Sequence, residues 1–325
     1  MNIVVLILQW LFYILIFPGF LFCVVFGILL AGLDRKLVAR MQKRVGPPIL
    51  QPLFDFLKLC GKETIVPRQA NKKVFLAAPV IGLASLLVTS LVLPLSATFT
   101  ACSGVADVIV VLYLLTIPAA AIIMGAAASG SPYAGVGLSR EMVAVMAYEL
   151  PLVILIVAVC RKVGLSMEEG GMTFSLATIM QYQAQHGALL FNISMIPAAI
   201  AMLFVIPCEV GHHPFDIAEA ETEICEGTLA EYSGTPLAIF ELTHYVKMFI
   251  LTSLFCVLFL GGITTGIVVV DIVIRVVFCF VVMFLTMTLP HAVCARFKVE
   301  KVFKFYWTWV TGLAALSLIL AWIGL

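Results

Sequence analysis

Long apolar segments dominate this chain and leave few folds open to it. The first of them, residues 3–33, contains no charged side chain. Hydrophobic residues make up 63% of the 325 residues and charged residues only 11%, whereas a soluble domain carries about 25% charged residues. The segments have the length of membrane-spanning helices and lack the alternation of a membrane β-barrel. The sequence therefore predicts an all-α integral membrane protein that forms a single polytopic domain, 1–325.

About eight segments are long and apolar enough to cross a lipid bilayer. A further apolar segment, 49–62, is too short to span and contains Asp55 and Lys58, so it predicts an amphipathic helix at the interface after the first span. The expected spans are 3–31, 73–95, 107–128, 139–160, 191–209, 236–260, 265–289 and 303–324.

The Lys and Arg residues predict the orientation, because cytoplasmic loops carry an excess of them. With the N-terminus outside, fifteen of the nineteen Lys and Arg residues fall in cytoplasmic loops, and ten of these lie in the basic loop 34–73. Eight spans then leave both termini outside a cell (inner or cytoplasmic) membrane. The loop 209–235 lies on the same cytoplasmic side as the basic loop.

The loop 209–235 is strongly acidic. Between Glu209 and Glu231 it holds seven of the eighteen Asp and Glu residues of the chain, with no Lys or Arg among them. Clustered carboxylates repel one another and raise each other's pKa. Such a cluster at a membrane boundary indicates the handling of protons or cations, or the docking of a partner.

The nine cysteines are scattered, and no two of them are spaced as CxxC. We therefore expect no iron–sulfur cluster, zinc site or disulfide framework, and no metal or other cofactor, in this chain. The sequence also contains no nucleophile–base constellation, phosphate loop or nucleic-acid motif. We expect no catalytic residue and no nucleic-acid partner.

The basic loop has an ordered pattern beyond its charge. Arg40, Lys43 and Arg44 precede a turn at 46–48, and the interfacial helix follows. Residues 39–63 read ARMQKRVGPPILQPLFDFLKLCGKE. Taken alone, the loop also fits positive-inside charge followed by a turn. In its order of residues it resembles the membrane subunit at the joint of respiratory complex I, which is the H subunit in bacteria and the first NADH-dehydrogenase subunit in mitochondria.

Three later segments resemble the same family, in the same order. They are Ser139–Glu149 in the fourth span, Pro214–Gly234 in the acidic loop, and Arg296 with Trp307 around the last span. The resemblance therefore covers nearly the whole chain.

Two departures from the complex I pattern distinguish this chain. Pro47-Pro48-Ile49 leads directly into Leu50, without the extra residues of most complex I members. This compact form resembles the group 4, membrane-bound nickel–iron hydrogenases of anaerobes. His212 and His213 stand where the complex I pattern has an arginine, which puts the expected carboxylate–guanidinium pair in doubt. Because histidine titrates near neutral pH, both are candidates for a pH response.

Glu141 and Glu149 are candidates for a proton relay in the fourth span. A carboxylate in mid-membrane costs about 2.5–3.5 kcal/mol, so it normally faces protein or water. Eight residues of helix separate the two by about 12 Å, which water or other side chains can bridge. As alternatives, Arg140 neutralises Glu141, Glu141 caps its helix, and Glu149 hydrogen-bonds a neighbouring helix.

Further candidates follow in the acidic loop. If 217–229 is helical, Glu219, Glu223 and Glu226 share one face, and with Asp216 they form a coupled, proton-holding cluster. The alternative is a solvated face paired with the basic loop.

At the start of the sixth span, Glu241 and His244 are spaced i, i+3 and either carry protons inward or form an interfacial ion pair. His186 and His291 lie near span ends and are predicted to be ordinary interface residues. The family pattern also implies docking of a peripheral arm by Arg40, Lys43, Arg44, Asp55, Lys58 and Glu231.

The resemblance implies a membrane-anchoring and coupling subunit of a ferredoxin-linked, proton- or sodium-translocating nickel–iron hydrogenase. The implied partners are the hydrogenase large and small subunits, ferredoxin-like iron–sulfur subunits and an antiporter-like membrane subunit, in the lipid bilayer. The nickel–iron centre and the iron–sulfur clusters would belong to those partners.

Two alternatives stay open. One is the equivalent subunit of a quinone-, phenazine- or sulfur-reducing complex I relative. The other is a stand-alone cation/proton transporter, although the inverted repeat typical of such transporters is not visible in the sequence.

Overall fold

The computed structural model describes residues 3–94, 107–166, 171–263 and 265–324. Within these ranges every regular element is helical, and seven helical stretches are long and apolar enough to span a membrane. These seven stretches are Trp10–Met41, Lys72–Val92, Val108–Ser129, Pro132–Leu165, Gly234–Phe259, Val268–Val293 and Val299–Ile323. The prediction of an all-α integral membrane protein is confirmed.

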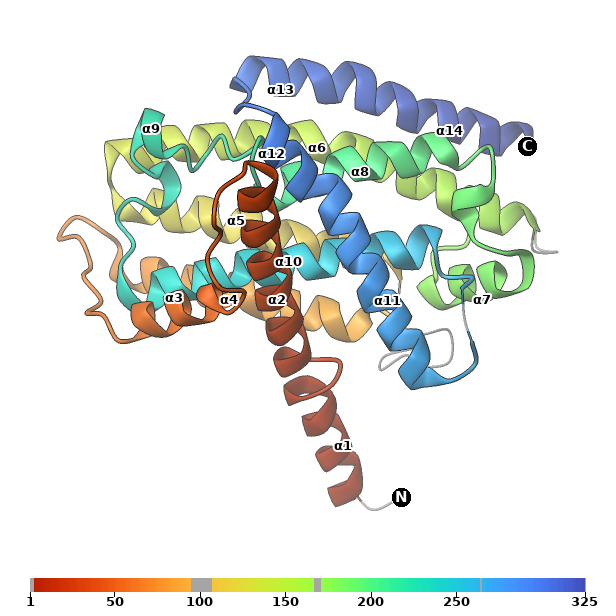
Figure 1. Cartoon of the computed structure of the whole chain (residues 1–325), viewed down its shortest axis with the longest axis horizontal. Helices are drawn as coiled ribbons and strands as arrows, with labels where there is room; N and C mark the ends of the chain where they lie inside the picture. Colours follow the sequence, from red (N-terminus) through yellow and green to blue (C-terminus); the bar gives the residue numbers. More distant parts are fainter. Residues whose placement is uncertain (1–2, 95–106, 167–170, 264, 325) are drawn as a thin grey trace.

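The helices differ in direction (Figure 1). Those that run along the long axis of the molecule include α4 (Lys72–Val92), α5 (Val108–Ser129), α6 (Pro132–Ser166), α8 (Ile196–Val210) and α10 (Gly234–Phe259). A second group, α1 (Ile3–Leu15), α2 (Phe20–Met41) and α11 (Val268–Met283), is inclined steeply to them. The chain ends with α12 (Leu289–Val293), α13 (Val299–Phe305) and α14 (Thr311–Ile323), and π-helical turns at Phe284–Thr288 and Tyr306–Val310 precede α12 and α14.

Helix α10 is the core of the bundle. In its most apolar window 94% of the residues are buried, against 28% to 56% in the other six candidate spans. It packs against α2, α4, α8 and α11. Because side chains all around α10 contact protein, its few charged residues can interact only with other parts of the chain or with an internal cavity.

The predicted span 191–209 corresponds to α8, which is shorter than the seven long helices. A 3-10 turn, Leu189–Phe191, precedes it, and Gly211 ends it with a φ of +79°. Its 15 residues extend about 22 Å. The predicted interfacial helix is confirmed as α3 (Gln51–Cys60). A further helix, α7 (Leu176–His186), was not predicted, because LATIMQYQAQH is too polar for a span.

The prediction of a helix over 217–229 is wrong. The segment forms one helical turn, α9 (Glu221–Ile224), and a 3-10 turn at Gly227–Leu229. Between them Cys225 and Glu226 adopt positive φ values of 50° and 66°, which a right-handed helix cannot contain. Glu219, Glu223 and Glu226 therefore do not share a helical face.

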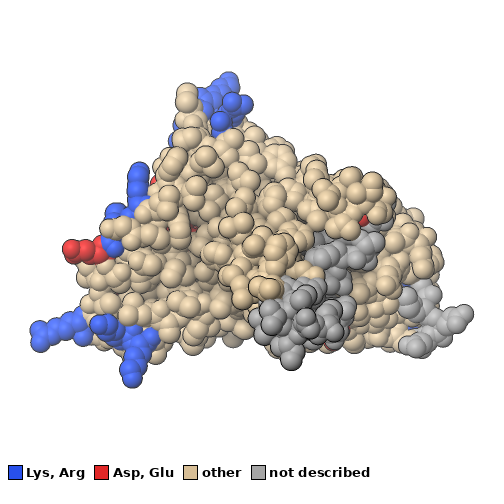
Figure 2. Space-filling model, turned by 90° about the horizontal axis from the view of Figure 1, so that it is seen from below, with Lys and Arg blue, Asp and Glu red and all other residues tan. Residues whose placement is uncertain are grey.

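Most Lys and Arg side chains that are visible in Figure 2 lie toward one end of that face, and the broad middle of the face is free of charge among the described residues. A broad uncharged region beside a basic end is the surface expected of a protein that crosses a bilayer.

Candidate functional site

A cavity of about 460 Å³ lies among the helices, and its wall is rich in ionisable side chains. Its lining comes from α2, α5, α6, the end of α8 with the segment that follows it, α10, α12 and residue 296. Four of the five histidines of the chain line it. The ionisable lining residues are Asp34, Arg35, Glu141, Cys208, His212, His213, Asp216, Glu219, Glu241, His244, Tyr245, Lys247, His291 and Arg296.

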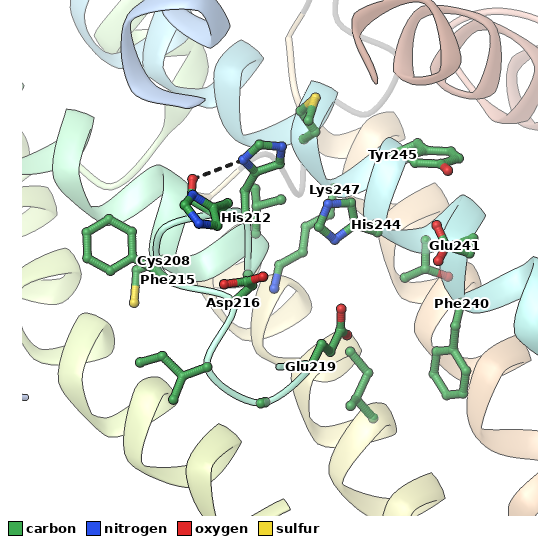
Figure 3. A pocket seen from close by; sticks show the side chains of 18 of the residues that line it. Cys208, His212, Phe215, Asp216, Glu219, Phe240, Glu241, His244, Tyr245 and Lys247 are labelled. Carbon is green, nitrogen blue, oxygen red and sulfur yellow. Dashed lines mark hydrogen bonds between the residues drawn. The ribbon is translucent and has the colours of Figure 1, made fainter. Parts of the chain in front are cut away.

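Residues 211–219 form part of the cavity wall, and their course is set by the way α8 ends. Gly211 adopts the left-handed conformation that ends the helix, and the chain then runs along the cavity as an irregular segment. Figure 3 shows the side chains of Asp216 and Glu219 on this segment pointing toward that of Lys247 on α10. Carboxylates and an amine thus face the same space.

Asp34 is the most deeply buried carboxylate of the cavity, with 2% of its side chain exposed. The Thr288 hydroxyl donates to its Oδ1 over 2.7 Å. Its Oδ2 lies 3.1 Å from Nε2 of His212 and 3.8 Å from Nδ1 of His291. A buried carboxylate at the end of the first span therefore holds groups from two distant segments.

The ring of His212 lies between two acceptors. Its Nδ1 lies 3.2 Å from the His213 carbonyl oxygen, and its Nε2 faces the Asp34 carboxylate. Both ring nitrogens meet acceptors, and only the doubly protonated ring can donate to both. Burial alone would lower the pKa of His212, but the hydrogen bond and charge of Asp34 raise it above its ordinary value.

His213 has the opposite environment. Burial lowers the pKa of its ring, Asp216 opposes this shift, and electrostatic interactions with His291, Arg296 and His212 lower the pKa further. Its ring stacks on that of His291, with centroids 4.8 Å apart. The two pH-responsive candidates are therefore adjacent in sequence but shifted in opposite directions.

Asp216 forms a two-pronged ion pair with Arg296. The Arg296 Nε and Nη2 atoms donate to the two carboxylate oxygens over 2.8 and 2.6 Å. A carboxylate–guanidinium pair therefore exists in the acidic segment, even though histidines stand where the complex I pattern has its arginine. The arginine comes instead from the loop before α13.

Glu219 lines the cavity without a positively charged partner in direct contact among the described residues. Burial raises its pKa to about 8, and the negative charges of Glu241, Glu141 and Asp216 add to this shift. Glu219 therefore holds a proton at neutral pH. Of the predicted cluster, Asp216 and Glu226 interact electrostatically with Glu219, and Glu241 and Glu141 join them.

One face of α10 brings Glu241, His244 and Lys247 to the cavity. The Lys247 ammonium donates to the backbone carbonyl of Glu209. The Glu209 side chain is buried, and its Oε2 accepts no hydrogen bond within the described parts of the chain. An unsatisfied buried carboxylate oxygen is costly, so Glu209 is a further candidate for proton exchange beside the cavity.

The structure separates the two predicted relay residues of α6. Glu141 lines the cavity, whereas Glu149 is exposed on another side of the helix. Between them the buried Tyr148 hydroxyl lies within electrostatic range of Glu209, Glu141 and Glu149. Glu141 is not neutralised by Arg140, because Arg140 instead pairs with Glu223 over 2.6 Å.

The other predicted residues lie outside the cavity. Glu226 is exposed and Glu231 is half-buried. The docking candidates Arg40, Lys43, Arg44 and Lys58 are exposed.

Asp55 differs from the other docking candidates, because it accepts hydrogen bonds from Arg35 over 3.1 Å and from Gln51 over 2.8 Å. Arg35 also donates to the Tyr245 hydroxyl over 3.0 Å. Asp55 therefore attaches α3 to α2 and α10.

Sequence reasoning missed Asp34 and His291 as parts of one site. Asp34 is the first charged residue after the apolar run 3–33. It was not singled out because it stands at the start of a loop rich in Lys and Arg. His291 resembles an ordinary interface histidine. Nothing in the sequence brings residues 34, 212 and 291 together. The packing of α12 on α2 brings residues 34 and 291 close, and the segment after α8 brings His212 to Asp34.

Comparison with known proteins gives concordant results. A family model described as NADH dehydrogenase matches residues 13–322. The H subunit of the NADH-quinone oxidoreductase of Rhodospirillum rubrum is 35% identical over 239 residues, which cover 70% of this chain and 67% of the relative. The corresponding protein of Bordetella petrii is 33% identical over 244 residues, which cover 72% of this chain and 67% of the relative.

Among solved structures, a chain of the membrane-bound sulfane sulfur reductase, an archaeal respiratory membrane complex, is similar to this one. The TM-score is 0.86 at 30% identity, over 97% of this chain and 99% of that chain. The named relatives are parts of respiratory membrane complexes. The chain therefore belongs to the NADH dehydrogenase subunit 1 family, and it is a membrane subunit of a respiratory membrane complex, similar to the H subunit of complex I.

Proposed function

We propose that this chain couples electron transfer in a peripheral partner to the movement of protons through its charged cavity. The observation that carries the proposal is the cavity itself, where Glu141, Glu219 and Glu241 share one space with Lys247. Carboxylates that sense each other's charge titrate as a coupled set, so a change of protonation at one alters the proton occupancy of the others. A change of charge in a docked redox partner would shift their proton occupancy.

Two surfaces support this role. The exposed Arg40, Lys43, Arg44 and Lys58 offer a basic docking surface to the peripheral partner. On α6, the exposed Glu149 would be costly against lipid, so an antiporter-like membrane partner that covers it would both shield it and receive the proton signal. Tyr148 interacts electrostatically with Glu141, which lines the cavity, and with Glu209 and Glu149.

The orientation follows from the positive-inside rule. With α8 counted as the eighth crossing, both termini lie outside. The basic and acidic loops then face the cytoplasm, where soluble electron carriers of the ferredoxin type are found.

The test is substitution of Glu141 by Gln in the intact complex, reconstituted into sealed vesicles. We expect proton translocation per electron to fall about a hundredfold, since a fixed proton carrier is worth roughly two to four orders of magnitude. The exposed Glu300 on α13 supplies the matched control, Glu300→Gln, which should keep wild-type translocation. Unchanged translocation in Glu141→Gln, in a fully assembled complex, would refute the proposal.

The terminal reaction has two candidates. The compact turn 47–50 favours the ferredoxin-linked nickel–iron hydrogenase group. The extensive similarity to the sulfane sulfur reductase chain favours a complex that reduces sulfur compounds, and we place this second candidate first for that reason.

Purification of the complex through this chain distinguishes the candidates. Nickel at one equivalent, with hydrogen evolved from reduced ferredoxin, would establish the hydrogenase. Iron without nickel, with reduction of sulfane sulfur, would establish the sulfur reductase. Reduction of a quinone or phenazine would overturn both.

A further inference from the structure

Asp34, His212 and His291 converge from three separate segments on one point of the cavity wall. Their segments are α2, the chain after α8, and α12. One ligand-type atom from each, a carboxylate oxygen and two ring nitrogens, lies within 4.8 Å of the other two. Such convergence of nitrogen and oxygen donors is the basic requirement of a metal site.

The separations suit a small tetrahedral ion. Zn²⁺ binds imidazole nitrogen and carboxylate oxygen at about 2.0–2.2 Å, which places neighbouring ligands roughly 3.4 Å apart. In the structure the Asp34 oxygen lies 3.1 Å from the His212 nitrogen and 3.8 Å from the His291 nitrogen. The two distances from Asp34 lie on either side of the required value, and the two ring nitrogens lie within 4.8 Å of each other, so the rings must rotate toward each other to complete the site.

The His291 ring supplies an independent sign of a ligand. Its Nδ1 is buried and makes no hydrogen bond within the described parts of the chain, although it faces the Asp34 carboxylate. A buried ring nitrogen without a partner is costly. A metal ion between Nδ1 and the carboxylate would satisfy both.

The surroundings hold the ligands in place. The Thr288 hydroxyl fixes the other oxygen of Asp34 over 2.7 Å, and the ring of His213 packs on that of His291. Contacts of this kind orient ligands at metal sites. About a third of the His291 side chain is exposed, which leaves an entry path for an ion.

We propose that Asp34, His212 and His291 bind a single divalent transition-metal ion, with Zn²⁺ as the ion that fits best. Two imidazoles and one carboxylate form a borderline-soft donor set that suits zinc, and the fourth position would face the cavity. The ligands are not cysteines, which is why the scattered cysteines carry no sign of the site. Binding requires no turnover, so the proposal stands apart from the coupling function.

The test measures zinc binding to the intact, chelator-washed complex in detergent, without substrate. Wild-type complex should bind one more equivalent of Zn²⁺ than the His291→Asn and His212→Asn complexes, or bind it at least about a hundredfold more tightly. Thr288→Val should weaken binding about tenfold, as removal of a contact that orients a ligand does. His186, an exposed histidine on α7, supplies the control His186→Asn, which should bind zinc like the wild type.

Equal zinc binding by the wild-type and both ligand variants would overturn the proposal, as would the same loss in His186→Asn. A measurement without variants covers the case in which a variant fails to assemble. Co²⁺ added to wild-type complex should give the intense visible absorption of tetrahedral Co²⁺, in a difference spectrum that Zn²⁺ abolishes. Weak octahedral bands, or bands that zinc leaves unchanged, would also contradict the site.

Discussion

The charges of the cavity wall 211–219 and those of the basic loop 34–73 lie in contrasting environments. In the cavity wall, His212 and Asp216 are held by partners from distant elements, and Glu219 is kept protonated by burial. In the basic loop, Arg40, Arg44 and most other bases extend into the surroundings. Partly buried charges respond to a neighbouring charge by changing protonation, whereas exposed ones mainly attract a partner.

The largest expected effect is on proton translocation, and it distinguishes a carboxylate of the acidic segment that lines the cavity from one that does not. Glu219→Gln should lower coupled proton translocation by about one to two orders of magnitude, because it removes a carboxylate that carries a proton in the cavity. Glu226→Gln should leave it within about twofold, as exposed substitutions do, since Glu226 lies outside the cavity. Translocation in sealed vesicles measures both, and equal effects would remove the distinction between the two environments.

The next effect concerns stability. Arg296→Ala strands Asp216, and only about a fifth of either side chain is exposed, so we expect a loss of about 2 kcal/mol, which is below the cost of breaking a fully buried pair. Arg140→Ala breaks a pair whose Glu223 side chain is 53% exposed and should cost about 0.5 kcal/mol. Thermal unfolding measures the loss of stability in each variant. A larger loss of stability in Arg140→Ala than in Arg296→Ala would contradict the prediction.

A third prediction follows from the pKa of Glu219, which is about 8 in the folded chain against an ordinary 4.5. Above pH 4.5 the unfolded chain releases this proton while the folded chain keeps it. The contribution of Glu219 to stability is therefore fully present below pH 4.5 and is lost as pH rises toward 8. We expect the Tm of the wild type to fall more between pH 5.5 and 8 than that of Glu219→Gln.

Infrared spectroscopy checks the same group directly. At pH 7 the wild type should show a protonated carboxylic acid band that Glu219→Gln lacks. An identical band in both proteins at pH 7 would show that Glu219 is ionised and that another acid carries the proton.

The sequence predicts the helices of this chain better than it predicts the site. The spans follow from apolar length, and α3 follows from Asp55 and Lys58 within a short apolar run. The prediction of a helix over 217–229 was wrong because a pattern of charges gives no information on the positive φ values at Cys225 and Glu226. The ion pair between Arg296 and Asp216 depends on tertiary packing, which the local spacing of residues does not predict.

The sequence predicted some of the cavity residues and not others. Glu141, Asp216, Glu219, Glu241 and His244 stand out as ionisable groups in or beside apolar segments, and all five line the cavity. Asp34 does not stand out, because its importance lies in what it faces. A buried carboxylate is recognised only once the helices around it are placed.

The smallest expected effect belongs to the basic loop. Arg40→Ala with Arg44→Ala should change the stability of the chain by less than about 0.5 kcal/mol, because both side chains are exposed. It should weaken association of the peripheral partner by roughly five- to tenfold, since each exposed charge contributes about 0.2–1 kcal/mol. The difference in association between wild type and variant should shrink above physiological salt, where charges more than about 8 Å apart are screened.

Release of the partner from immobilised complex at rising salt measures this difference. Equal release from wild type and variant at low salt would mean that the basic loop does not dock a partner, and its charge would then serve only to orient the chain in the membrane.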